Sequence, residues 1–319
     1  MSALPPRYVV VVALTLAPGL LAAQDGLITA PVPVIEARLR GQPFDVVQQA
    51  GSRFEGDRTS HGLLHFADSS YMDVKLAKAP QGGAAFNNEP RYEIAAYALQ
   101  KLFLNEPDYV VPPTVARMVS VDDYHKISAT PTEPTFTDAS SVLLILQYWT
   151  LDVTSKGVFD TKRAARDTAY ARHLGDLNVF TYLVRQRDAN AGNILISSDT
   201  LHPRMFSVDN GVTFDSPASN RGTEWSSMRV KRIGRATATR LERLRSEDLT
   251  HALGVMAQFE RRAGQYVVVE PTANLDPSRG VRRKGDVLQL GLTEPEIDGV
   301  RRRLEWLVGR LRDGRLTTF

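Results

Sequence analysis

The chain has 319 residues, of which 43% are hydrophobic and 24% charged, values typical of a globular protein with a sizeable core. This composition excludes a disordered chain, a collagen-like repeat and a coiled coil. The formal net charge is only +3, so no strongly basic field favours nucleic acid, and we expect no nucleic-acid partner. Cysteine is absent, which excludes disulfides, thiol nucleophiles, iron–sulfur clusters and cysteine-bound zinc.

The N-terminus has the features of a secretory signal. An apolar run at 8–17 follows Arg7, a Pro18-Gly19 break comes next, and small residues precede a polar stretch that begins at Gln24. A membrane-spanning helix needs about 20 apolar residues, and this run is shorter. We therefore expect residues 1–23 to form a signal peptide or a short anchor, and the protein to be exported: periplasmic, secreted or membrane-associated. A buried valine-rich strand is the alternative.

Residues 24–149 are mainly of β character, and we expect them to form the first of two lobes. Runs of apolar and β-branched residues between polar turns predict strands, and apolar residues along one face predict a helix. The segment from Pro31 to Pro43 has no clear period. The expected elements are strands at 44–51, 61–67 and 71–77, a helix at 92–103, a β region at 110–121, a surface loop rich in Ser, Thr and Pro at 128–141, and a buried strand at 142–149.

Residues 150–319 are mainly of helical character and form the second expected lobe. The expected elements are a helix at 164–186, short strands at 194–196 and 205–208, and amphipathic helices near 237–263 and 295–312. A β-rich half followed by a helix-rich half predicts an α+β protein of two lobes, with a hinge near residues 147–149. A cleft between two lobes is a favoured place for a ligand.

The most informative polar pattern begins at Asp188, in the segment RDANAGNILI. Four residues separate Asp188 from Asn193, and a short apolar strand follows. This is the pattern of the protein-kinase catalytic loop, in which the Asp orients the attacking hydroxyl and the Asn holds a metal. Gly192 permits a tight turn, and a hairpin of the two short strands would bring Asp209 back beside Asn193. A carboxylate and an amide so placed are hard oxygen ligands for Mg²⁺ or Mn²⁺.

Two charged residues upstream fit the same chemistry. Lys75 lies in an expected strand, from which its long side chain can reach toward phosphates in the cleft. Glu93 lies in the first turn of the next helix, where it can pair with Lys75. Lys78 is the competing phosphate lysine, and Glu89 competes with Glu93 as its partner. Each feature alone is common, but the order of all of them on suitable elements favours kinase-type chemistry over coincidence.

Two segments carry a resemblance to known families. The segment Glu93–Tyr97 (EIAAY), with the VPP and ARMV that follow, resembles the helix-C segment of the secretory-pathway (Golgi casein kinase-like) kinases. The stretch from Asp188 to Ile196, with VDNGVTF at 208–214, resembles the type II phosphatidylinositol 4-kinases and their bacterial relatives. Both groups replace the usual Asp-Phe-Gly by Asp-Asn-Gly. The resemblance covers roughly residues 45–215.

The resemblance implies a two-lobed protein-kinase-like fold, with ATP bound by residues 24–149 and the catalytic loop in residues 150–319. It implies an ATP-dependent kinase that transfers the γ-phosphate to a hydroxyl of a protein, a lipid or a sugar. The implied site comprises the catalytic Asp188, the nucleotide-binding residues Lys75, Glu93, Gln147 and Tyr148, and the metal ligands Asn193 and Asp209, with Mg²⁺ or Mn²⁺ as the ion. The chain has no clear glycine-rich phosphate loop. A catalytically inactive nucleotide-binding module and a nucleotidyl transferase on the same fold are the alternatives.

Two arginine-rich stretches lie near the C-terminus, at 229–245 and 279–315. They are either solvated helix faces or a basic surface that contacts an anionic substrate or a membrane headgroup. His61 and His65 have the spacing of metal ligands on a helix, but they fall in an expected strand pair. We therefore interpret both histidines as structural or exposed.

Overall fold

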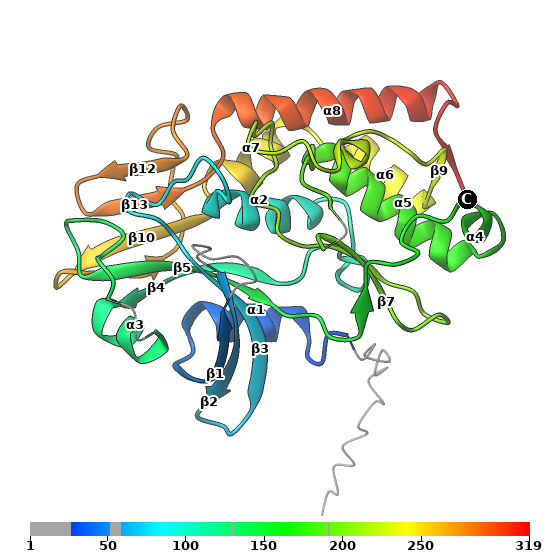
Figure 1. Ribbon diagram of the computed structural model, residues 1–319. Helices are drawn as coiled ribbons and strands as arrows, with labels where there is room; N and C mark the ends of the chain where they lie inside the picture. The colour runs from blue at the N-terminus through cyan, green and yellow to red at the C-terminus, as the bar shows by residue number, and fades with distance from the viewer. Residues whose placement is uncertain (1–26, 52–58, 129–130, 191) are drawn as a thin grey trace, which may run out of the picture.

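The computed structural model describes residues 27–51, 59–128, 131–190 and 192–319 (Figure 1). The expected signal peptide at 1–23 lies outside these residues. Among the helices of the described ranges, none combines the length and the apolar character needed to cross a membrane.

The first half of the chain forms a five-stranded antiparallel sheet in the order β1-β2-β3-β5-β4. The three-stranded meander that the sequence predicts is confirmed, and so is the buried strand, β5, all of whose residues are buried. A strand buried along its whole length must be covered on both faces of the sheet. The strands are β1 (Phe44–Gly51), β2 (Thr59–Phe66), β3 (Tyr71–Lys78), β4 (Thr114–Ser120) and β5 (Ser141–Tyr148).

Helices cover this sheet, and the sequence patterns do not predict two of them. The expected helix is α2 (Pro90–Gln100), which begins at a proline because the first turn needs no N–H donor there. Helix α1 (Val32–Gly41) buries Ile35 and Leu39 against the sheet. Its prolines lie just before and within its first turn, where a helix tolerates them. They interrupt the apolar pattern in the sequence, but they do not prevent the helix from forming. The short helix α3 (Val121–Ile127) begins at the cap Ser120, within the expected β region.

The second half of the chain contains several helices, but it also contains a second sheet, so it is less helical than predicted. The expected helix at 164–186 is two helices, because Asp167 lies between them and accepts the backbone N–H of Tyr170 at 2.9 Å as the cap of the second helix. The predicted hairpin of 194–196 and 205–208 is present. These elements are α4 (Thr161–Arg166), α5 (Thr168–Leu183), β6 (Val153–Thr154), β7 (Ile194–Ser197) and β8 (Met205–Ser207).

The prediction of one amphipathic helix near 237–263 is wrong. Two shorter helices occupy its first part, α6 (Arg235–Arg243) and α7 (Ser246–Gly254), and a second sheet follows in the order β11-β10-β13-β12. Ala263 and Gly264 both have positive φ and make the tight turn between its first two strands. The strands are β10 (Ala257–Arg262), β11 (Gln265–Val269), β12 (Val281–Lys284) and β13 (Val287–Leu290).

This second sheet packs beside the first. Phe259 and Leu288 share a buried cluster with Leu143 and Ile145 of β5, and the N–H of Ser140 donates to the carbonyl of Gly264 at 2.8 Å. The last helix, α8 (Glu294–Arg312), runs along the upper edge of Figure 1 and contacts α5, α6 and α7. A short parallel pair joins β9 (Arg232–Ile233) to β14 (Thr317–Thr318) near the C-terminus. The second half of the chain therefore helps to cover the first sheet.

Candidate active site

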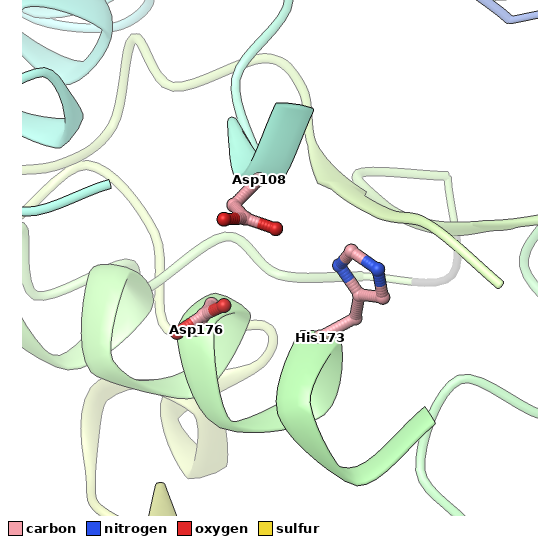
Figure 2. A group of neighbouring side chains, drawn as sticks. All are labelled: Asp108, His173 and Asp176. Atoms are coloured by element: carbon pink, nitrogen blue, oxygen red, sulfur yellow. The ribbon is translucent and has the colours of Figure 1, made fainter. Parts of the chain in front are cut away.

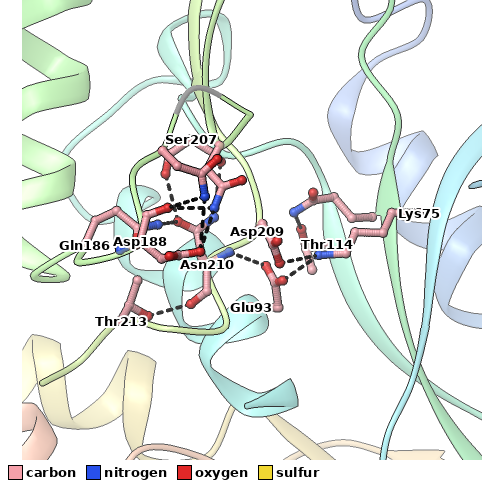
Figure 3. A network of polar contacts seen from close by, with 12 residues as sticks. Lys75, Glu93, Thr114, Gln186, Asp188, Ser207, Asp209, Asn210 and Thr213 are labelled. Carbon is pink, nitrogen blue, oxygen red and sulfur yellow. Dashed lines mark hydrogen bonds and ion pairs between the residues drawn. The ribbon is translucent and has the colours of Figure 1, made fainter. Parts of the chain in front are cut away.

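A half-buried lysine links the sheet, α2 and the segment after β8. Lys75 lies on β3, and its Nζ is 2.8 Å from Glu93 Oε1 and 3.0 Å from Asp209 Oδ1 (Figure 3). Burial works to lower the pKa of Lys75, but the charges of Asp209 and Glu93 outweigh it and raise that pKa above its ordinary value. Lys75 is therefore a fixed positive charge held between two carboxylates.

Glu93 connects α2 to the Asp-Asn-Gly segment. It lies in the first turn of α2 and is buried, and its second oxygen, Oε2, accepts the backbone N–H of Asn210 at 3.0 Å. Gly211 lies against the residue that precedes α2 by two positions: a Cβ on this glycine would come within 2.7 Å of Asn88 Cα. The backbone of the segment thus lies directly against the start of α2, and only glycine fits there.

Asn210 is a structural residue that the sequence pattern alone does not reveal. Its side chain is fully buried, where Oδ1 accepts from Ser207 Oγ at 2.8 Å and from Gln186 Nε2 at 3.2 Å. The same glutamine accepts the backbone N–H of Asp188 at 3.0 Å through its Oε1. Gln186 therefore joins the Asp188 loop to the Asp-Asn-Gly segment, and the buried amides fix the two segments relative to each other.

The carboxylate of Asp188 is surrounded by donors. Asn193 Nδ2 donates to the Asp188 carbonyl at 2.7 Å and to Oδ2 at 3.2 Å, as the predicted tight turn requires. Arg221 donates through Nε to Oδ1 at 3.0 Å and through Nη2 to Oδ2 at 3.3 Å. Ser219 Oγ donates to Oδ1 at 2.5 Å. Ser219 and Arg221 come from the segment after Asp-Asn-Gly, and no sequence pattern points to either.

Asn193 and Asp209 offer oxygen atoms for a metal. The carbonyl of Asn193 accepts the N–H of Val208 at 2.9 Å, so the hairpin brings Asn193 beside the residue that precedes Asp209. The amide nitrogen of Asn193 donates to Asp188, so its Oδ1 points away from Asp188. Among the described residues, neither Asn193 Oδ1 nor Asp209 Oδ2 has a hydrogen-bond partner. An amide oxygen and a carboxylate oxygen are hard ligands that suit Mg²⁺ or Mn²⁺.

The two hinge residues of the expected nucleotide site point to opposite faces of the sheet. Gln147 pairs with Lys75 across the ladder and so shares its face, where Gln147 Nε2 donates to Thr114 Oγ1 at 2.9 Å. Tyr148 pairs with Val74, is buried in the cluster on the other face, and contacts Thr29 Oγ1 through its hydroxyl at 3.2 Å. The structure therefore does not bring the Tyr148 side chain to the other predicted site residues.

The competing residues Lys78 and Glu89 lie outside the Lys75 cluster. Lys78 Nζ donates to Thr132 Oγ1 at 2.7 Å and lies over the ring of Tyr124. Glu89 Oε2 accepts the backbone N–H of Ala85 at 2.8 Å, and burial raises the pKa of this carboxyl. Of the two lysines and two glutamates that the sequence leaves open, Lys75 and Glu93 are the pair in contact.

An ion pair attaches α2 to α8. Glu296 accepts from Arg91 Nη1 at 2.6 Å and Nη2 at 2.9 Å, and from the Tyr92 hydroxyl at 2.5 Å. It also caps its own helix by accepting the N–H of Thr293. Arg91 and Tyr92 are the two residues before Glu93, so α8 holds the turn of α2 that carries the lysine's partner.

A second cluster of titratable groups lies between the 3₁₀ turn Glu106–Asp108 and α5 (Figure 2). The ligand atoms of Asp108, His173 and Asp176 lie within 4.8 Å of one another. Asp108 pairs with Arg172 at 2.7 Å, and Asp176 accepts from Thr237 Oγ1 at 2.6 Å. Burial raises the pKa of Asp176 to about 7. The predicted metal ligands, Asn193 and Asp209, are not part of this cluster.

The histidines on β2 are paired with neighbours in the sheet. His61 Nε2 lies 2.8 Å from Asp73 Oδ1 and its ring packs on Trp149, and the ring of His65 packs on Tyr71. Many arginines of the two basic stretches are also engaged within the chain. Arg282 donates to the backbone carbonyls of Gly254, Asp276 and Leu292.

Neither a scan against protein-family models nor a search of curated proteins gives a match. Among solved structures, the chain is similar to hydra Fam20 with sugar, at 13% identity over 90% of each chain, with a TM-score of 0.50. A MAP kinase from Leishmania major is matched at 12% identity over 69% of this chain and 64% of that chain, with a TM-score of 0.32 that is too low to support an inference. At such identity the likeness to Fam20 shows the fold alone. It confirms that the chain has a kinase-like fold.

Proposed function

We propose that the protein is an ATP-dependent kinase that transfers the γ-phosphate of ATP to a hydroxyl. The observation that carries the proposal is the contact of Lys75 with both Glu93 and Asp209. Lys75 and Asp209 are 134 residues apart in the sequence, and a structural ion pair would need only one of the two carboxylates. A lysine paired with a helix-borne glutamate, near an aspartate beside the Asp188 loop, is the arrangement that protein kinases use for phosphoryl transfer.

Each residue has a distinct role in this proposal. Lys75 binds the phosphates of ATP, and Glu93 positions Lys75 through their ion pair. Asp188 accepts the proton of the acceptor hydroxyl and orients the oxygen for attack. Little covalent chemistry is asked of the protein, so its contribution is positioning and charge neutralisation.

The oxygen atoms of Asn193 and Asp209 would hold a divalent cation. Their chemistry fits Mg²⁺ or Mn²⁺, since both ions prefer oxygen ligands and the chain has no cysteine for softer ions. A bound cation supplies neutralisation of the charge on the phosphates. Asn193 has a second task, because its amide nitrogen holds Asp188 in place.

The test is nucleotide turnover by the purified full-length chain. With ATP and Mg²⁺ or Mn²⁺, we expect ADP to form, and we expect Asp188→Ala to abolish its formation. Asp199→Ala is the matched control, since Asp199 is an exposed aspartate in the β7–β8 loop that caps its own turn. ATP binding without ADP formation would favour the inactive module, and AMP attached to a target would favour nucleotidyl transfer.

The acceptor is a hydroxyl of a protein, a lipid or a sugar, and the three classes are separated by one screen. Labelled ATP is offered to the enzyme with an acidic protein, with inositol lipid vesicles and with free sugars, each beside an Asp209→Ala control. Export through the N-terminal leader is part of the proposal, and it is tested by finding the protein outside the cytoplasm when the whole gene is expressed. Label in one acceptor class only, absent from the control, identifies the substrate.

A further inference from the structure

A serine hydroxyl donates a hydrogen bond to the carboxylate of Asp188, the residue that accepts the proton in the proposed reaction. Ser219 Oγ lies 2.5 Å from Asp188 Oδ1, and it also accepts the backbone N–H of Arg221 at 3.2 Å. A hydroxyl has a single hydrogen to donate, and here that hydrogen is directed to Asp188. An acceptor hydroxyl must make this same contact with a general base before phosphoryl transfer.

The segment that carries Ser219 is held on the Asp188 loop by contacts of its own. Arg221 makes two hydrogen bonds to Asp188, and Arg187 donates to Asn220 Oδ1. Gly222 has φ +125°, and a Cβ there would lie 2.6 Å from the backbone of Ala189. The backbone of this segment is therefore in close contact with the loop, so the position of Ser219 does not depend on its own hydroxyl.

A purely structural role does not account for Ser219. The Asp188 carboxylate is already held by Asn193 and by the two nitrogens of Arg221, and its backbone N–H is held by Gln186. Ser219 is half-buried, so part of the residue is exposed to solvent. A serine so placed is presented to the proposed base as a substrate would be.

We propose that Ser219 is a phosphorylation site modified by the enzyme's own active site, within the same molecule. This inference rests on the proposed function. Ser219 Oγ attacks the γ-phosphorus of ATP, the bond from that phosphorus to the bridging oxygen breaks, and ADP leaves with the bond electrons. The hydroxyl proton passes to Asp188. The products are phosphoserine, ADP and the proton, which Asp188 then returns to solvent.

Modification would also remove the Ser219 hydroxyl from Asp188. A phosphoserine carries about −1.5 to −2 charges at neutral pH and has no hydrogen to donate to a carboxylate. Repulsion from the Asp188 carboxylate would move the Ser219 side chain off the base. The base then becomes available to an acceptor from solution.

The experiment follows phosphate on Ser219 and ADP in the same samples. Full-length protein, first treated with phosphatase and then freed of it, is incubated with Mg²⁺ and ATP and analysed by peptide mass spectrometry. We expect one phosphate on Ser219 per chain, formed with a rate constant that does not change when the protein is diluted about tenfold. Ser219→Ala and Asp188→Ala should lack this phosphate. Ser219→Thr should restore a phosphate at this position.

Ser216→Ala is the matched control, because Ser216 lies in the same segment and its Oγ accepts only the N–H of Ala218 among the described residues. It should leave the modification of Ser219 unchanged. ADP formation with Ser219 unmodified would overturn this inference and leave the proposed function standing. A rate constant that rises with protein concentration would show transfer between molecules and overturn the intramolecular claim. Absence of both ADP and phosphate would overturn the proposed function itself.

Discussion

At the scale of single residues, the position of Lys75 between two acids makes it the most sensitive point of the site. We expect Lys75→Met to lower ATP turnover by about a hundredfold or more, because the variant loses the cation that faces the phosphates. It should also lower thermal stability, since buried Glu93 loses its partner. Turnover is therefore measured well below the melting temperature of the variant.

Lys78→Met is the matched control, three residues along the same strand, and it should retain turnover. Loss of turnover in Lys78→Met with activity kept in Lys75→Met would show that the other lysine binds the phosphates.

Asp209 provides a second test at this scale. Asp209→Asn removes the one carboxylate assigned to the cation, so binding of Mg-ATP should weaken by roughly tenfold or more, since contacts to charged groups contribute about 1.5–3 kcal/mol. Calorimetry with and without Mg²⁺ measures the effect, with Asp199→Asn as the control. Equal affinity of the variant and the parent would show that Asp209 does not bind the cation.

The sequence identifies candidate site residues where a side chain is of a type unusual for the helix or strand that carries it. A lysine in an apolar strand and an Asp-x4-Asn before a short strand are such cases, and the structure places Lys75 with Glu93 and Asp209, and Asp188 with Asn193. Gln186 and Ser219 could not be selected, because an amide after a helix or a serine in a loop acquires its partners only when distant segments meet. The Tyr148 side chain lies away from the expected site because side chains alternate along β5, which places Tyr148 on the face opposite Gln147.

At the scale of elements, α2 depends on α8 for its position. We expect Glu296→Ala to lower the free energy of unfolding by about 1.5–3 kcal/mol, because half-buried Arg91 loses its charged hydrogen bonds and keeps Glu89, at 3.4 Å, as a nearby acid. Denaturant unfolding measures this change. Glu294→Ala is the control: this glutamate lies in the same first turn of α8 but is exposed, so its loss should cost no more than about 0.5 kcal/mol. Equal losses in both variants would mean that the contacts of Glu296 with Arg91 and Tyr92 do not stabilise the fold.

Local sequence patterns predict the helices and strands that form because of their own residues and not because of distant contacts. The meander, β5, α2 and the β7–β8 hairpin all follow from alternation, apolar runs and turn residues. The segment that became α7 and β10 mixes charged and apolar residues in a way that fits a helix face as well as a strand. Its strands are determined by packing on β5 through Phe259, which lies 114 or more residues from its partners, and no local pattern carries that information.

At the scale of the whole molecule, the buried cluster around α5 makes stability depend on pH. Burial raises the pKa of Asp176 from 3.8 to about 7, with Asp108 adding to the shift and Thr237 and Arg172 opposing it. The folded protein then holds a proton that the unfolded chain has lost, so stability is full below pH 4 and falls as the pH rises to about 7. His173 works in the opposite sense: burial, with Arg172 and Arg204, lowers its pKa from 6.5 to about 3, so its contribution is lost as the pH falls through that range.

We therefore expect Asp176→Asn to be more stable than the parent at pH 8, by up to about 4 kcal/mol, since each pKa unit corresponds to about 1.4 kcal/mol. The gain should vanish near pH 4. Melting curves across this range measure it, with the exposed Asp199→Asn as the control. A gain that is the same at every pH would show that Asp176 does not titrate in the folded protein.

The ion pair between Arg91 and Glu296 joins residues that are made at different times. They are 205 residues apart, and a ribosome adding about 5–20 residues per second makes the second one roughly 10 to 40 seconds after the first. Throughout that interval the nascent chain lacks the ion pair between Arg91 and Glu296, although Lys75 and Glu93 have already been made. A message that ends early, before α8, would encode every residue of the proposed site and still yield a polypeptide without this support for α2.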